Sequence, residues 1–174
     1  MDLYVIWRDI LGCDDEFIVF HSPNLSEVEA KYKELTSEPL KICTSDNGCI
    51  IDKLGVDEED MGVTKISLPS DVTKIYFSYI LEYDELFYYN PFIILYYFDA
   101  DEMFDDINLL FFMPGPGNTH RIDEELCDIC GASGPISNEC KASMINELKR
   151  DNEAEFDVDG YAYHIYLKEL SLYT

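Results

Sequence analysis

The longest stretch of this chain without a lysine or arginine runs from Ile75 to His120 and covers forty-six residues. It carries fourteen of the twenty-four aromatic side chains and eight carboxylates. Aromatic side chains bury large areas and favour strands, so this stretch is expected to supply core strands. No basic residue within the stretch neutralises its acids. We therefore expect the same stretch to present a negative surface.

The whole chain has the same imbalance, with a formal net charge of −24 on 174 residues. A surface of this sign repels nucleic acid and anionic membranes and attracts basic proteins. Apolar residues make up 47% of the chain, which excludes a disordered acidic tail. Salt adaptation, or acidity that serves only solubility, are the alternative explanations of the charge.

A cytoplasmic location is expected from three features. The N-terminal Met1–Val5 segment has no positive charge of the kind that begins a secretory signal. The most apolar run, Leu86–Phe98, is too short to span a bilayer. Six cysteines without a secretory signal are typical of reduced thiols.

The pattern of elements predicts an α+β fold, in which a few helices pack on an antiparallel β-sheet and a C-terminal helix is followed by a β-hairpin. The clearest break is the Pro- and Gly-rich segment Met113–Asn118. It divides the chain into a main α+β domain, residues 1–113, and a helix-plus-hairpin lobe, residues 119–174. We expect the two to pack as one unit.

Alternating apolar residues predict the early strands. They are expected at Leu3–Ile10 and Glu16–His21 as a hairpin, at Leu40–Cys43 and Cys49–Asp52 around the turn Ser45–Gly48, and at Val63–Leu68. Asn24 is the expected cap of a helix that ends before Pro39, with Glu27 at the capping-box spacing. The helix is expected to bury one face, formed by Leu25, Val28, Tyr32 and Leu35.

Residues 70–89 fit both a helical interval and a strand composition, and the β-branched and aromatic content favours a strand up to Leu81. Later elements are expected as a strand buried on both faces (Phe92–Phe98), helices (Asp99–Phe112, Ile122–Cys127 and Ser137–Arg150) and a hairpin (Glu155–Val158 and Tyr161–Leu170) around Asp159-Gly160.

Four residues have a spacing related to zinc sites: His120, Cys127, Cys130 and Cys140. Three thiolates and one imidazole complete a tetrahedron, and the Gly131 after the Cys-x-x-Cys pair suits such a turn. The usual second ligand pair is missing, and neighbouring acids raise thiol pKa values. Free, mostly buried thiols are therefore the alternative to a zinc ligand set.

No catalytic signature is present. We expect His21, His120 and His164 to be ordinary imidazoles rather than catalytic bases. No Ser, Cys or Asp stands in a nucleophile motif, and the chain has no glycine-rich phosphate loop. Calcium is another use for clustered acids, and Asp99, Asp101 and Asp105 have the spacing that begins a calcium loop. Phe104 occupies the position where that loop needs glycine, which argues against it. We therefore predict no enzyme activity and no resident cofactor, with zinc as the alternative.

The acids are better explained as a docking surface. In composition the chain resembles the acidic DNA-mimic anti-restriction and anti-CRISPR proteins of phages and plasmids, although no family motif matches. This resemblance implies a non-enzymatic inhibitor that occupies the basic nucleic-acid-binding surface of a partner protein. The expected contact residues are the acids of two clusters: Asp99, Asp101, Glu102, Asp105 and Asp106 first, then Asp57, Glu58, Glu59 and Asp60.

Tyrosines beside these acids, such as Tyr88, Tyr89, Tyr96 and Tyr97, are candidate interface anchors or core residues. Two other functions compete with the inhibitor. One is an immunity protein that neutralises a cationic toxin or nuclease. The other is a small regulatory module stabilised by zinc.

Overall fold

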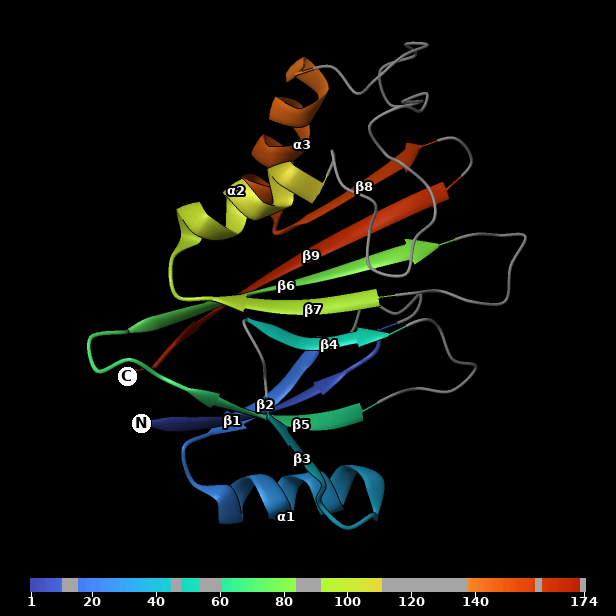
Figure 1. The fold of residues 1–174 in the computed structure, drawn as a ribbon. Coiled ribbons are helices and arrows are strands. Elements are labelled where there is room, and N and C mark those ends of the chain that lie inside the picture. Colours follow the sequence, from blue (N-terminus) through green and yellow to red (C-terminus); the bar gives the residue numbers. More distant parts are fainter. Residues whose placement is uncertain are drawn as a thin grey trace.

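Two stacked β-sheets form the centre of the molecule, with helices on both outer faces (Figure 1). The computed structural model describes residues 1–10, 16–44, 48–53, 61–83, 92–110, 138–158 and 161–172. The four-stranded sheet has the order β2-β1-β5-β3 and consists of β1 (Asp2–Arg8), β2 (Ile18–Ser22), β3 (Ile42–Thr44) and β5 (Met61–Ser67).

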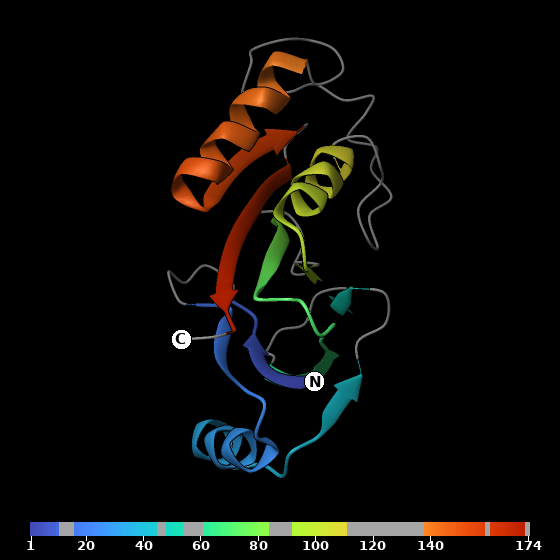
Figure 2. The same ribbon diagram turned by 90° about the vertical axis from the view of Figure 1, so that its left-hand side faces the viewer.

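The five-stranded sheet has the order β4-β7-β6-β9-β8. Its strands are β4 (Cys49–Lys53), β6 (Lys74–Tyr83), β7 (Phe92–Tyr97), β8 (Glu153–Val158) and β9 (Tyr161–Ser171). Helix α1 (Leu25–Thr36) covers the outer face of the four-stranded sheet, and α2 (Ala100–Leu110) and α3 (Asn138–Asp151) cover the outer face of the five-stranded sheet. Figure 2 shows these layers from the side. The predicted α+β class is confirmed.

The main hydrophobic core lies between the two sheets. Alternate residues of β1 point into it, as do those of β6, so that Val5 and Phe77 are fully buried. The indole of Trp7 closes one part of this core and donates a hydrogen bond to the Thr64 hydroxyl at 3.1 Å. Position 62, beside Trp7, requires glycine because a Cβ there would come within 2.3 Å of the indole ring.

The two predicted hairpins at the ends of the chain are confirmed by antiparallel pairing of β1 with β2 and of β8 with β9. The hairpin predicted around residues 45–48 is wrong. Strand β3 pairs in parallel with β5 in one sheet, whereas β4 pairs with β7 in the other sheet. The chain therefore crosses between the sheets at the place where the local turn residues favoured a hairpin.

The strand predicted for the ambiguous segment is confirmed by β6, which pairs with β7 on one side and with β9 on the other. The prediction that β7 is buried on both faces is wrong in part, because Ile93, Leu95 and Tyr96 are only half-buried. Strand β7 lies next to the edge strand β4, and α2 covers only part of its outer face.

Helix α1 begins as predicted, since the Asn24 side chain accepts a hydrogen bond from the Ser26 amide at 3.1 Å. The predicted buried face is correct only at its centre. Val28 and Tyr32 are buried, whereas Leu25 and Leu35, at the two ends of the helix, are 38% and 40% exposed. Only the middle of α1 therefore packs against the sheet.

The boundary predicted between residues 113 and 119 lies outside the described residues, so the two-domain division stays a prediction. Strand β9 pairs with β6 over ten residue pairs, and α3 packs beside α2 on the same sheet. The predicted helix at Ile122–Cys127 and the hairpin turn Asp159-Gly160 also lie outside the described residues. Within the described ranges, no helix is long and apolar enough to cross a membrane.

Candidate protein interface at helix α2

Helix α2 is held in place by its cap and by one apolar face. The Asp99 carboxylate accepts hydrogen bonds from the amides of Asp101 and Glu102 at 2.9 and 3.0 Å. The Asp99 carbonyl accepts the first helical hydrogen bond, from Met103. Asp99 is therefore the N-cap, and its carboxylate is already used inside the protein. Met103 and Ile107 are buried against the five-stranded sheet.

The other four predicted acids of this cluster share the exposed side of α2. Asp101 and Asp105 form one pair a helical turn apart, and Glu102 and Asp106 form a second. All four side chains are exposed, and none makes an ion pair within the described part of the chain. Like charges four residues apart destabilise a helix by about 0.2–0.5 kcal/mol per pair. The acidic face thus costs α2 stability.

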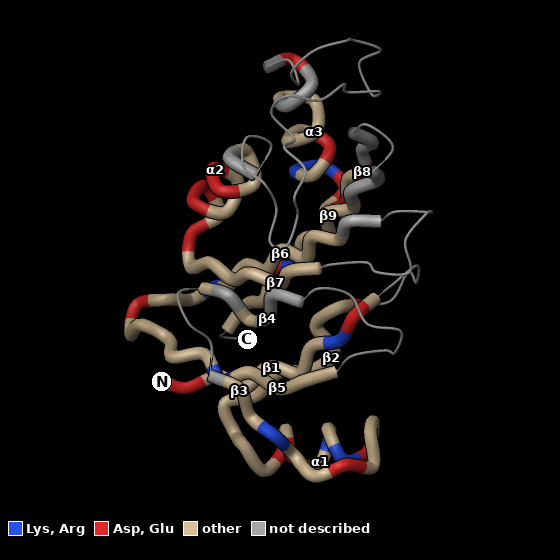
Figure 3. Tube along the Cα trace, turned by 45° about the vertical axis from the view of Figure 1, so that its right-hand side comes forward, with Lys and Arg blue, Asp and Glu red and all other residues tan. Residues whose placement is uncertain are grey.

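Several acids elsewhere have a cationic partner. Ion pairs join Asp2 to Lys65 at 2.8 Å and Glu169 to Lys74 at 2.6 Å. Figure 3 shows α1 carrying both signs of charge, whereas the charged residues along α2 are all acidic. The sequence around α2 has no lysine or arginine, and within the described residues the fold brings none from elsewhere to pair with these four carboxylates.

One cation near α2 could not be found from the local sequence. Lys149 of α3 lies over the ring of Phe104, with its Nζ atom 4.7 Å from the ring centroid. This contact is beside a pocket of about 230 Å³ between α2, α3 and β9. The residues that line that pocket do not include the four acids. Lys149 therefore lies on a different side of α2 from the pocket-lining acids Glu102 and Asp106.

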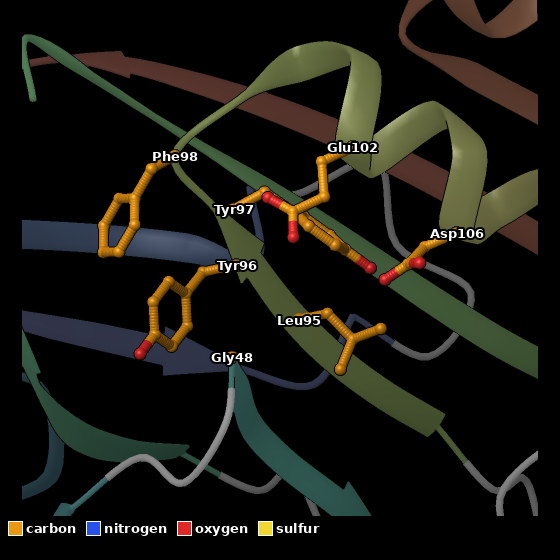
Figure 4. A pocket seen from close by; sticks show the side chains of 7 residues that line it. All are labelled: Gly48, Leu95, Tyr96, Tyr97, Phe98, Glu102 and Asp106. Carbon is orange, nitrogen blue, oxygen red and sulfur yellow. The ribbon is translucent and has the colours of Figure 1, made fainter.

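A second pocket, of about 250 Å³, lies where α2 passes the edge of β7 (Figure 4). Glu102 and Asp106 line it from the helix. The remaining lining comes from the sheet and from the residue before β4: Gly48, Leu95, Tyr96, Tyr97 and Phe98. The Gly48 carbonyl accepts a hydrogen bond from the Tyr96 amide at 2.7 Å, which holds the start of β4 beside this pocket.

Tyr97 passes beneath α2, and Figure 4 shows its hydroxyl directed toward the Asp106 carboxylate. The side chain is only 7% exposed, and its hydroxyl has no hydrogen-bond partner within the described residues. Burial, followed by the negative charge of Asp106, raises the pKa of Tyr97 above its usual range. A buried hydroxyl without a partner costs about 1–3 kcal/mol, so this pocket contains an unsatisfied polar group.

The tyrosines predicted as anchors have different positions. Tyr97 is buried against the helices, and Tyr96 is half-buried and packs edge-to-face with Phe98, with ring centroids 5.6 Å apart. Tyr88 and Tyr89 lie outside the described residues. The second acidic cluster, Asp57, Glu58, Glu59 and Asp60, also lies outside them.

The proposed zinc ligands are not tested by the structure. His120, Cys127 and Cys130 lie outside the described residues, and so does the side chain of Cys140, although this residue belongs to α3. In the part of the chain that is described, no group of three or more His, Cys, Asp or Glu side chains could hold a metal ion.

Two of the three histidines have clear surroundings. In His164, Nε2 lies 2.8 Å from the Glu155 carboxylate and Nδ1 lies 3.0 Å from the Tyr166 hydroxyl. The contact with Glu155 joins β9 to β8, the contact with Tyr166 lies within β9, and together they satisfy both ring nitrogens. His21 is half-buried, and burial, followed by the positive charge of Lys168, lowers its pKa. Both environments are those of structural histidines.

Comparisons of this chain with protein-family models, with curated proteins and with solved structures found no match. Its function must therefore be inferred from its own residues.

Proposed function

We propose that this protein is a non-enzymatic inhibitor that places helix α2 against the basic, nucleic-acid-binding surface of a partner protein. The observation that supports this most directly is the set of four exposed carboxylates on α2 without an ion-pair partner in the described structure. Asp99 is not included among the contact residues, because its carboxylate caps the helix.

The spacing of these charges is close to that of duplex DNA. Asp101 and Asp106 are five residues apart, which corresponds to about 7.5 Å along a helix axis. Four carboxylates lie within this length, whereas B-DNA carries about one charge per 1.7 Å, or about four over the same distance. Helix α2 thus supplies the charge of about two base pairs. A longer mimic would use the other acidic clusters as well.

The cost of this arrangement also supports a binding role. A lysine at one position of each like-charge pair would turn repulsion into attraction. The chain instead has acids at all four positions, and no basic residue in the last turn of α2. Local rules of this kind are commonly broken where binding requires it. A cationic partner would remove the repulsion when it binds.

Affinity capture with the intact protein tests the proposal. The protein is immobilised and exposed to lysate of the cells in which it is naturally produced, and retained proteins are identified by mass spectrometry. We expect a basic nucleic-acid-binding protein that duplex DNA releases and that added salt releases progressively. A retained protein that DNA does not displace would contradict the proposal. Capture of a toxin through a surface unrelated to nucleic acid would assign an immunity protein instead.

Two variants with the same change of net charge locate the surface. The first neutralises the acids of α2: Asp101→Asn, Glu102→Gln, Asp105→Asn and Asp106→Asn. The second neutralises four exposed acids on other elements: Glu29→Gln, Glu38→Gln, Asp71→Asn and Glu153→Gln. We expect capture to fail with the first variant and to persist with the second. Equal losses would mean that total charge, rather than α2, determines binding.

A further inference from the structure

The pocket beside α2 has two chemically different ends. Glu102 and Asp106 supply carboxylates at one end, one helical turn apart on the same helix. At the other end, Tyr96 and Phe98 supply aromatic rings (Figure 4). This combination favours a ligand that is cationic at its tip and apolar along its stem.

The volume of about 250 Å³ limits the size of the occupant. Small-molecule and cofactor sites usually occupy about 300–1,000 Å³. The pocket is smaller than these, so it suits a single side chain of a partner better than a whole cofactor.

The buried Tyr97 hydroxyl is an independent sign that the site is incomplete. It is directed toward Asp106, and the polar side chains of Asp106 and Ser78 act on it, yet no hydrogen bond of ordinary length and angle is formed within the described structure. A small shift of Asp106 toward Tyr97 would allow the hydroxyl to donate to one carboxylate oxygen. The other oxygen would then be held in position for a cation. Tyr97 would thus act as a positioning residue through Asp106.

Three kinds of cation can be compared with this site. Calcium takes six to eight oxygen ligands, and the apolar walls cannot supply them. A lysine ammonium is a compact, strongly hydrated charge and has no planar fork to pair with carboxylates. A guanidinium is planar and weakly hydrated, forms paired hydrogen bonds with carboxylates and stacks on aromatic rings. The lining therefore favours a guanidinium.

We infer that this pocket binds one arginine side chain of the partner protein, with the guanidinium between Glu102 and Asp106 and the stem along Tyr96 and Phe98. The inference rests on the proposed function, because the arginine belongs to the basic surface that α2 contacts. It adds a specific anchor to a surface otherwise recognised by charge. Arginines of nucleic-acid-binding surfaces that normally contact phosphates are suitable occupants.

Nuclear magnetic resonance titration of the intact protein with the peptide acetyl-Gly-Arg-Gly-amide tests this. We expect saturable shifts of the backbone amides at residues 95–98 and 102–106. The same peptide with lysine should bind several-fold more weakly, and the peptide with citrulline, which has no charge, should not bind. Absence of saturable shifts overturns the inference, as does equal binding of the lysine peptide or of Mg²⁺.

Variants on one helix provide the matched control. Glu102→Gln and Asp106→Asn should each weaken binding of the arginine peptide by about tenfold, because each removes a charged hydrogen-bond acceptor. The double variant Asp101→Asn, Asp105→Asn removes charge from the same helix outside the pocket. It should change binding by about twofold or less. If the pocket variants and the double variant weaken binding equally, the peptide is attracted to the charge of the whole helix, and the inference of an arginine pocket is wrong.

Tyr97→Phe tests the positioning residue. It should weaken the arginine peptide while leaving the fold intact, and unchanged affinity would overturn this role. The titration and the capture experiment fail independently. If the arginine peptide does not bind, the inference of an arginine pocket is wrong even if DNA displaces a captured partner. Peptide binding without any DNA-displaceable partner removes the proposed function instead.

Discussion

The Tyr79 hydroxyl on β6 donates a hydrogen bond to the carboxylate of Asp9, which follows β1, and both side chains are buried. The bond joins the two sheets across the main core. Tyr79 also stacks on Phe92, with ring centroids 5.4 Å apart. A polar bond within this aromatic cluster fixes how one sheet lies on the other.

Tyr79→Phe should lower the free energy of unfolding by about 1.5–3 kcal/mol, because a buried carboxylate loses a donor while the ring packing is kept. Urea denaturation measures this change, and Tyr76→Phe, at a half-buried position of the same strand, serves as the control. If the denaturation midpoint does not move, the bond between Tyr79 and Asp9 contributes nothing to stability.

Stability should also fall in alkali. Burial, followed by the hydrogen bond to Asp9, raises the pKa of Tyr79 above its ordinary value of 10.0. Above pH 10 the unfolded chain therefore releases a proton that the folded protein keeps. The unfolded state then binds fewer protons, so the free energy of unfolding decreases as pH rises, by at most about 1.4 kcal/mol per pH unit for one group. Below pH 10 this contribution is fully present.

Urea denaturation of the wild-type protein and of Tyr79→Phe between neutral pH and pH 11 checks the sign. The variant should show a shallower alkaline decrease. Some decrease should remain, because burial also raises the pKa of Tyr97. Identical slopes in the two proteins would show that Tyr79 ionises in the folded state much as it does in the unfolded chain.

Asp99 should behave as a structural residue, unlike the acids that follow it. Asp99→Ala should lower the free energy of unfolding by about 0.5–2 kcal/mol, because two amides at the start of α2 lose their acceptor. Asp99→Ser keeps a capping oxygen and should restore most of this stability and the binding of a captured partner. Loss of binding in a stable Asp99→Ser variant would make Asp99 a contact residue after all.

Asp105→Lys should stabilise the protein and weaken its binding. The change removes repulsion from Asp101 and adds an attraction in the favourable order, for a total of about 0.4–1 kcal/mol. Asp71→Lys, at an exposed position away from α2, is the control for stability and should stay within about 0.5 kcal/mol of wild type. Thermal or urea denaturation gives the stability, and the capture experiment gives the binding. A stabilised variant that retains full binding would argue against α2 as the interface.

Local sequence signals predicted most elements because helix caps, alternation and charge rows act over a few residues. Asn24 and Asp99 both begin helices through their side chains. The composition of residues 74–83 outweighed their helical interval because tertiary pairing places this strand between β7 and β9. The error at residues 45–48 has the opposite cause. The turn residues there favour a hairpin, but the following strand gains more by pairing with β7 in the other sheet.

The candidate site divides in the same way. Its acids are readable in the sequence, since their spacing places two pairs on the exposed side of one helix. The pocket could not be predicted from the sequence. Its lining combines Gly48 before β4, the end of β7 and one side of α2, and these come together only through the five-stranded sheet.

The sequence by itself determined the sign and density of the charge, the composition of the core and the positions of the three helices that the structure describes, because these depend on residue type and local spacing. Only the tertiary structure decided which strands became neighbours and that the hydroxyl of Tyr97 lies buried beside Asp106. Both outcomes depend on elements that the fold brings together, and no short sequence pattern encodes such contacts.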